Sequence, residues 1–148
     1  MNEKTARQIE EMKKQTIGVE VEMNSITREK AAKTAAEFFG TGRYQNTAGR
    51  NGYCTWSAWD ADGREWKFQK DVSIHGPDSE KCELVTPILT YSDIETLQEL
   101  IRKLRKAVPD HCKEKFPIKF VRLYQGKYSH ISQSIVIMIF VIFNDSVF

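Results

Sequence analysis

The chain has 148 residues, of which 41% are hydrophobic and 28% charged, so we expect one globular domain with a proper core rather than a disordered segment. Its net charge of +2 is too small to indicate a nucleic-acid-binding surface. Three cysteines, at positions 54, 82 and 112, form no Cys-x-x-Cys pair, which argues against a disulfide framework or zinc site and favours reduced thiols in a cytoplasmic protein.

The first feature along the chain is an acidic strand. Residues 1–15 are charged, lack the apolar stretch of a signal peptide, and predict a short polar helix or a frayed end. Residues 16–24 then alternate in the manner of a strand, which places Glu20 and Glu22 on one face and apolar residues on the other. Two neighbouring carboxylates repel unless a cation lies between them, and Mg²⁺ prefers such oxygens. The pattern therefore predicts either a divalent-cation site or a solvated acidic face.

A helix and a loop are predicted next. Thr27 is a candidate N-cap for a helix through Phe39, because alanines and Phe39 recur on one face of this segment. Gly40 is expected to end the helix. A loop rich in Gly, Asn and Thr is predicted over residues 40–52.

Two strands, over residues 53–59 and 65–74, are separated by residues 60–63, which contain an Asp-Gly pair typical of a β-hairpin. Alternation in the second strand predicts one polar face, which is either solvated or able to bind phosphate and metal. The side chains expected on that face are Lys67, Gln69, Asp71 and Ser73.

A further strand is predicted over residues 82–89, with a single carboxylate, Glu83, near its start. If this strand lies beside the first one, Glu83 could join Glu20 and Glu22 in one acidic site. The sequence Ser92-Asp-Ile-Glu95 has the form of a capping box and precedes a helical apolar stripe. A sheet fed by hairpins, with helices packed on one face, predicts an α+β fold.

The composition changes after residue 107. Residues 108–148 contain no Ala or Trp, and residues 135–143 form an apolar run without a clear period. Nine residues fall short of the roughly 20 needed to span a membrane, so no membrane association is expected. Two interpretations stay open, a buried strand or a divergent, frameshifted tail. The predicted organisation is therefore a polar segment (1–15), a main portion (16–107) and this tail.

Three stretches together resemble a known family. They are Gly-Val-Glu-Val-Glu-Met-Asn at 18–24, Trp-Lys-Phe-x-x-Asp-Val-Ser-Ile at 66–74 and Glu-Leu-Val-Thr-Pro-Ile-Leu at 83–89, followed by an amphipathic helix. In this order they resemble the amidoligases, carboxylate-amine ligases related to glutamine synthetase and glutamate-cysteine ligase. The resemblance covers about residues 16–107 and implies the N-terminal portion of a glutamine synthetase-like catalytic domain.

The resemblance also implies an activity and its cofactors. It implies an antiparallel sheet that binds ATP and Mg²⁺, activation of a small-molecule or peptide carboxylate as an acyl phosphate, and attack by an amine. Glu20 and Glu22 would match the family's Glu-x-Glu metal ligands, and Asp71 the acidic residue before the family's Ser. Glu83 would match the carboxylate of the Glu-Leu-Val-Thr-Pro motif and is expected to bind the same metal. Asp71 and Glu83 are thus the expected catalytic residues.

Two further residues, Lys67 and Ser73, are nominated on geometry alone as nucleotide-binding residues. The chain departs from the family in having no His-x-His, a motif that relatives usually carry on a strand after the second helix. Whether this chain is active therefore stays open. The alternative is a noncatalytic cation-binding or protein-interaction domain derived from such a ligase, in which an open sheet edge or the apolar tail could support self-association.

Overall fold

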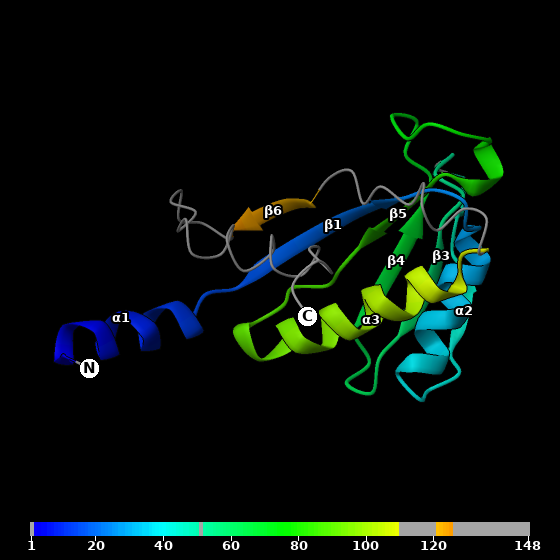
Figure 1. Ribbon diagram of the computed structural model, residues 1–148. Helices are drawn as coiled ribbons and strands as arrows, with labels where there is room; N and C mark the ends of the chain where they lie inside the picture. Colours follow the sequence, from blue (N-terminus) through cyan, green and yellow to red (C-terminus); the bar gives the residue numbers. More distant parts are fainter. Residues whose placement is uncertain (1, 51, 110–120, 126–148) are drawn as a thin grey trace.

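A computed structural model describes residues 2–50, 52–109 and 121–125. In these residues the chain forms one antiparallel sheet with strand order β2-β3-β4-β5-β1-β6 (Figure 1). The strands are β1 (Ile17–Met23), β2 (Tyr44–Asn46), β3 (Trp56–Trp59), β4 (Glu65–Gln69), β5 (Cys82–Val85) and β6 (Val121–Gln125). The helices are α1 (Glu3–Lys13), α2 (Arg28–Phe38) and α3 (Ile94–Ala107), with short 3-10 helices η1 (Asp78–Glu80) and η2 (Tyr91–Asp93). The predicted α+β class is confirmed.

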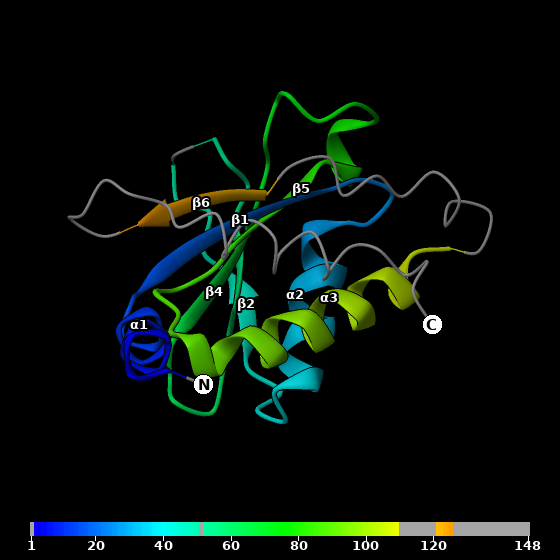
Figure 2. The same cartoon turned by 60° about the vertical axis from the view of Figure 1, so that its left-hand side comes forward.

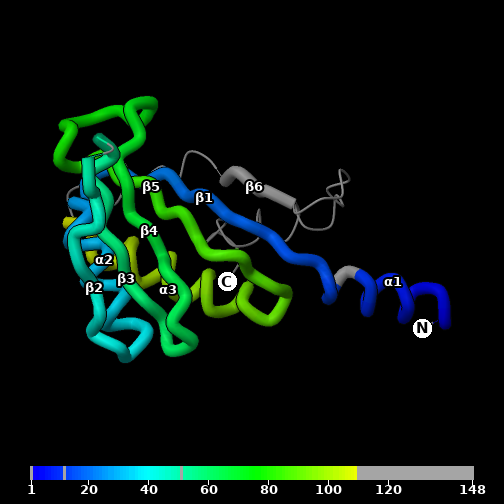
Figure 3. The backbone as a smooth tube through the Cα atoms, turned by 180° about the vertical axis from the view of Figure 1, so that it is seen from behind, coloured from blue at the N-terminus to red at the C-terminus, as the bar shows by residue number. Residues whose placement is uncertain are grey.

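The sheet has one apolar face and one polar face. Helices α2 and α3 lie side by side against the apolar face, whereas the view from behind shows the strands in front of both helices (Figures 2 and 3). Strict alternation in β1 explains the division, because its apolar residues are buried while Glu20 and Glu22 lie on the other face. The core contains Val19, Val21, Ala31, Ala32, Ala35, Ala36, Trp66, Phe68, Leu84, Leu100 and Leu104.

Helix α2 begins where the sequence predicts. The Thr27 side chain accepts a hydrogen bond from the backbone N–H of Lys30 at 3.2 Å, as expected of an N-cap. Four fully buried alanines on one face let the helix approach the sheet closely. Gly40, with φ of +72°, adopts the left-handed conformation just beyond the helix.

The predicted hairpin forms, but its strands are shorter than expected. Cys54 has a φ of +50°, so the chain is not extended there and β3 starts only at Trp56. Strand β4 ends at Gln69 because Asp71 begins a turn, in which its side chain accepts a hydrogen bond from the N–H of Ser73 at 2.8 Å. The strand predicted over 53–59 therefore started too early, and the strand predicted over 65–74 ended too late.

Two other boundaries also differ from the prediction. The stretch 40–52 contains the short strand β2, which the Gly- and Asn-rich composition concealed. Strand β5 ends at Val85. Beyond it, the hydroxyl oxygen of Thr86, rather than a backbone carbonyl, accepts a hydrogen bond of 3.0 Å from the N–H of Val19. The chain rejoins the sheet at Leu89, which forms an isolated bridge with Ile17.

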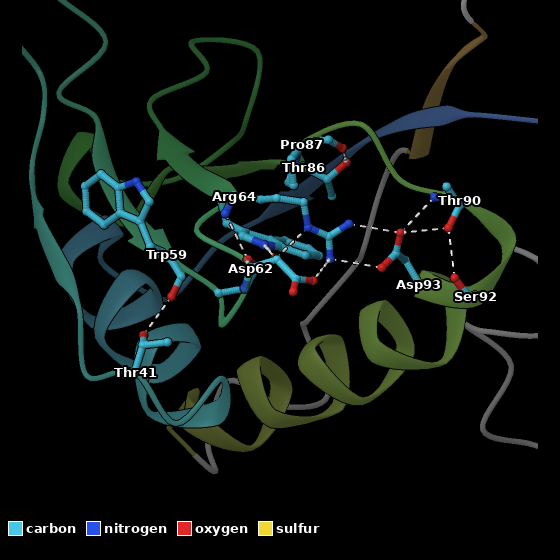
Figure 4. Close-up of polar contacts among 11 residues, drawn as sticks. Thr41, Trp59, Asp62, Arg64, Thr86, Pro87, Thr90, Ser92 and Asp93 are labelled. Atoms are coloured by element: carbon cyan, nitrogen blue, oxygen red, sulfur yellow. Dashed lines mark hydrogen bonds and ion pairs between the residues drawn. The ribbon is translucent and has the colours of Figure 1, made fainter.

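The capping box that precedes α3 lies two residues earlier than predicted. Thr90 and Asp93 form it, instead of Ser92 and Glu95. The Asp93 carboxylate accepts hydrogen bonds from the N–H of Thr90 at 2.8 Å and from its hydroxyl at 3.1 Å. Ser92 contacts only the Thr90 hydroxyl, at 2.9 Å (Figure 4). The 3-10 turn η2 thus begins the helical segment.

Asp93 also joins α3 to the β3–β4 hairpin. Arg64 donates from Nη1 and Nη2 to the two Asp93 oxygens at 3.0 and 2.9 Å (Figure 4). Its Nε donates to Asp60 at 2.9 Å. Trp66 donates its indole N–H to the same Asp60 oxygen at 2.9 Å. Two carboxylates therefore surround one guanidinium and hold the hairpin turn against the start of α3.

No helix within the described ranges is long and apolar enough to cross a membrane. The apolar run at residues 135–143 lies outside these ranges, so its interpretation as strand or foreign tail stays a prediction. Strand β6 pairs with β1, with Arg122 in register with Glu20, so this part of the tail adds a strand beside the acidic one.

Candidate functional site

A cavity of about 380 Å³ opens on the polar face of the sheet. Strands β1, β4 and β5 supply its floor, and the loops before β3 and after β4 supply its walls. It is lined by Glu20, Gly52, Tyr53, Gln69, Lys70, Asp71, Val72 and Glu83. Three carboxylates nominated from sequence, Glu20, Asp71 and Glu83, therefore line one cavity although they are far apart in the chain.

Glu83 is the most buried of these carboxylates, with 8% of its surface exposed. The register of the sheet places it between Glu22 on β1 and Gln69 on β4, in one row across three strands. The Nε2 of Gln69 donates a hydrogen bond of 2.9 Å to Oε2 of Glu83. The predicted adjacency of the first strand and the strand that carries Glu83 is confirmed.

Electrostatics set Glu83 apart from an ordinary surface carboxylate. Burial raises its pKa, and the charges of Glu20, Asp71 and Glu22 raise it further, whereas the hydrogen bond from Gln69 opposes the shift. Glu20, Asp71 and Glu22 are therefore close enough to Glu83 to repel its charge. A cation in this place would relieve that repulsion.

Asp71 and Ser73 do not extend the face of β4. Since β4 ends at Gln69, the prediction that alternation would place Lys67, Asp71 and Ser73 on one strand face was wrong beyond that residue. Asp71 nevertheless reaches the cavity, because the turn after the strand directs the chain back toward it. Ser73 is exposed and does not line the cavity.

The lysine at the cavity is Lys70, three residues after the lysine nominated from sequence. Lys67 is exposed and does not line the cavity. Its Nζ lies 3.9 Å from Oε2 of Glu65. Lys70 does line it, and its ammonium forms an ion pair with Asp78. If β4 continued past Gln69, its alternation would place Lys70 on the apolar face of the sheet. The sequence could therefore have pointed to Lys70 only by showing that the strand ends at Gln69.

Both walls of the cavity are anchored by Arg28, the first residue of α2. Its Nε donates to the carbonyl of Cys54 at 3.1 Å, and its Nη1 donates to the carbonyls of Asp78 and Lys81 at 2.9 and 2.6 Å. The two walls also meet directly, through the N–H of Lys70 and the carbonyl of Tyr53 at 2.7 Å. Sequence analysis did not identify Arg28, because long-range backbone contacts leave no motif.

The donor atoms suit Mg²⁺ in kind, since carboxylate oxygens are its preferred protein ligands and it commonly uses only one or two of them together with water and phosphate. In the described part of the chain, no three His, Cys, Asp or Glu side chains are placed so as to hold one ion. The floor thus presents suitable groups without a preformed metal cage.

The fold and the cavity together define an α+β protein whose antiparallel sheet carries an acidic site on the face opposite its helices. The family model described as "Putative amidoligase enzyme" matches residues 13–118, and the chain belongs to this family. The match confirms the resemblance expected over residues 16–107 and extends beyond it on both sides. The search of curated proteins and the search of solved structures found no match.

Proposed function

We propose that the chain is an ATP- and Mg²⁺-dependent carboxylate-amine ligase, with its nucleotide and metal site in the acidic cavity. The observation that carries the proposal is the meeting of Glu20, Asp71 and Glu83 in one cavity of an amidoligase-family chain. In this proposal the sheet is part of a glutamine synthetase-like catalytic domain. Its open, polar face would bind the substrates.

The carboxylates would have different roles, some in metal binding and one toward the amine substrate. One or two of Glu20, Glu22 and Glu83, together with water and phosphate, would hold Mg²⁺, which when bound neutralises phosphate charge and orients the phosphoryl group. The substrate carboxylate would take the terminal phosphoryl group of ATP, which leaves ADP and an acyl phosphate. The amine would then attack the acyl carbon and expel phosphate, while Asp71 orients the amine and accepts its proton. Positioning and charge neutralisation are the main requirements of this chemistry.

Calorimetric titration with a nonhydrolysable ATP analogue and Mg²⁺ tests the proposal. We expect the wild-type protein to bind the analogue only when Mg²⁺ is present. The double variant Glu20→Gln, Glu22→Gln should raise the Kd about tenfold or more, because two metal-binding carboxylates are lost. Glu65→Gln is the matched control, since Glu65 lies on β4 outside the cavity.

The results separate the proposal from its alternative. Metal-dependent binding that is weakened in the double variant and kept in Glu65→Gln supports a ligase site. Absence of nucleotide binding by folded wild-type protein would overturn the proposal. Binding of Mg²⁺ alone, sensitive to the same double variant, would then favour the noncatalytic cation-binding domain.

A further inference from the structure

Lys70 is the one cation among the residues that line the cavity, within the part of the chain that the structure describes. It shares the cavity with three carboxylates, Glu20, Asp71 and Glu83. Its backbone is fixed by the hydrogen bond to Tyr53, and 22% of its side chain is exposed. The position of Lys70 is therefore defined by the fold rather than by a flexible surface segment.

The ammonium of Lys70 pairs with a carboxylate that is not among the residues lining the cavity. Its ion-pair partner is Asp78, a residue of η1 whose side chain is 67% exposed. Asp78 also pairs with Lys81 at 3.1 Å, and Arg28 binds its carbonyl. The loop after β4 thus provides the Asp78 partner of the Lys70 ammonium, whereas Glu20, Asp71 and Glu22 act on Glu83 by charge repulsion.

The cavity therefore has two separate regions of charge, an anionic floor on β1 and β5 and a cationic group on its wall. A cation alone would need only the floor, and an anion alone would be repelled by it. A metal-bound phosphate needs both, because the metal binds carboxylates while the remaining phosphate charge binds a cation. Lysine is well suited to this second role as a compact point charge.

We infer that Lys70 binds the phosphate chain of a magnesium-bound nucleoside triphosphate in this cavity. The inference rests on the proposed function and adds a binding residue to it. A phosphate group can replace Asp78 as the partner of Lys70, since an exposed ion pair contributes little to stability and is readily exchanged.

The test compares Lys70→Met with Lys67→Met by calorimetric titration. Lys67 is the matched control because it lies three residues before Lys70, on β4, and outside the cavity. The probes are the nonhydrolysable ATP analogue and inorganic triphosphate, each with Mg²⁺. We expect Lys70→Met to raise the Kd of both probes roughly tenfold, the usual effect of losing one charge-assisted contact. Lys67→Met should leave both values within about twofold of wild type.

A charge-retaining variant and a folding check complete the design. Lys70→Arg should keep most of the affinity for both probes, because it retains the positive charge. A cooperative thermal unfolding transition should show that Lys70→Met is folded. If this variant does not fold, Lys70→Gln is used in its place. Wild-type affinity in the neutral Lys70 variant would overturn the inference while the Glu20→Gln, Glu22→Gln result still decides the ligase proposal. Failure of wild-type protein to bind either probe would overturn both.

Discussion

Gln69 donates a hydrogen bond of 2.9 Å to Glu83 across the β4–β5 strand pair, and this amide is the partner that the fold provides for the most buried carboxylate of the cavity. The bond only partly offsets the effect of burial and of the neighbouring charges, since the pKa of Glu83 stays raised. Glu83 is thus held in place by a neutral group that leaves its charge uncompensated.

Glu83→Gln should stabilise the metal-free protein at neutral pH. The variant removes a buried charge that Glu20, Glu22 and Asp71 repel, and a glutamine oxygen can still accept the bond from Gln69. We expect the free energy of unfolding to rise by about 0.5–2 kcal/mol at pH 7. Urea denaturation measures it. Gln69→Leu is the opposite control and should lower stability, because it leaves Glu83 without its donor.

The same variant should show a distinctive pH dependence. Because the native pKa of Glu83 lies above its ordinary value of 4.5, the folded state favours the protonated form. The cost of ionised Glu83 is therefore fully present above the native pKa and disappears as the pH falls through that pKa toward 4.5. The advantage of Glu83→Gln over wild type should shrink over that range. An advantage that is constant with pH would contradict the assignment.

Arg64→Met should destabilise the fold strongly. It leaves Asp60 and Asp93 without the guanidinium between them, in a region where Arg64 is 29% and Asp60 7% exposed. We expect a loss of about 2–4 kcal/mol by chemical denaturation. Arg102→Met is the matched control: Arg102 pairs with Glu99 on the exposed side of α3, and the change should stay within about 0.5 kcal/mol. Equal losses of unfolding free energy in the two variants would show that the Arg64 network contributes no more than an exposed ion pair.

Acid should remove the contribution of this network. Arg64 is the main cause of the lowered pKa of Asp93, and hydrogen bonds from Trp66 and Arg64 lower that of Asp60 against the effect of burial. Their stabilisation is present above the ordinary value of 3.8 and is lost as the pH falls through the lower native values. Wild type should therefore lose more stability than Arg64→Met between about pH 5 and pH 2. Parallel curves for the two proteins would contradict this explanation.

The two described cysteines should differ in reactivity. Cys54 is exposed, whereas burial raises the pKa of the Cys82 thiol to about 12. Because the thiolate is the reactive form, iodoacetamide at pH 8 should alkylate Cys54 in the native protein and Cys82 only after unfolding. Peptide mass spectrometry reports the two sites separately. Rapid native labelling of Cys82 would show that β5 opens locally.

Local patterns in the sequence were sufficient for much of the fold. The alternation of residues 17–23, the Thr27 N-cap and the Asp-Gly turn at residues 60–63 each depend on interactions between near neighbours, and each was predicted correctly. Among the boundaries that were wrong, the end of β4 and the position of the capping box also depend on near neighbours, whereas the end of β5 does not. Strand β5 ends where Thr86 binds the backbone of Val19, which is 67 residues away in the chain.

The candidate site divides in the same way. Alternation in the sequence nominated Glu20 and Glu22 for one polar face, whereas Glu83 could be added only if its strand lay beside the first one. The tertiary structure pairs β1 with β5 and brings Glu20, Glu83, Asp71 and Lys70 to the cavity, while Glu22 and Lys67 are not among its lining residues. Strand period specifies a face only while the strand lasts. Beyond Gln69 the direction of each side chain depends on a turn and on the anchoring of two loops by Arg28.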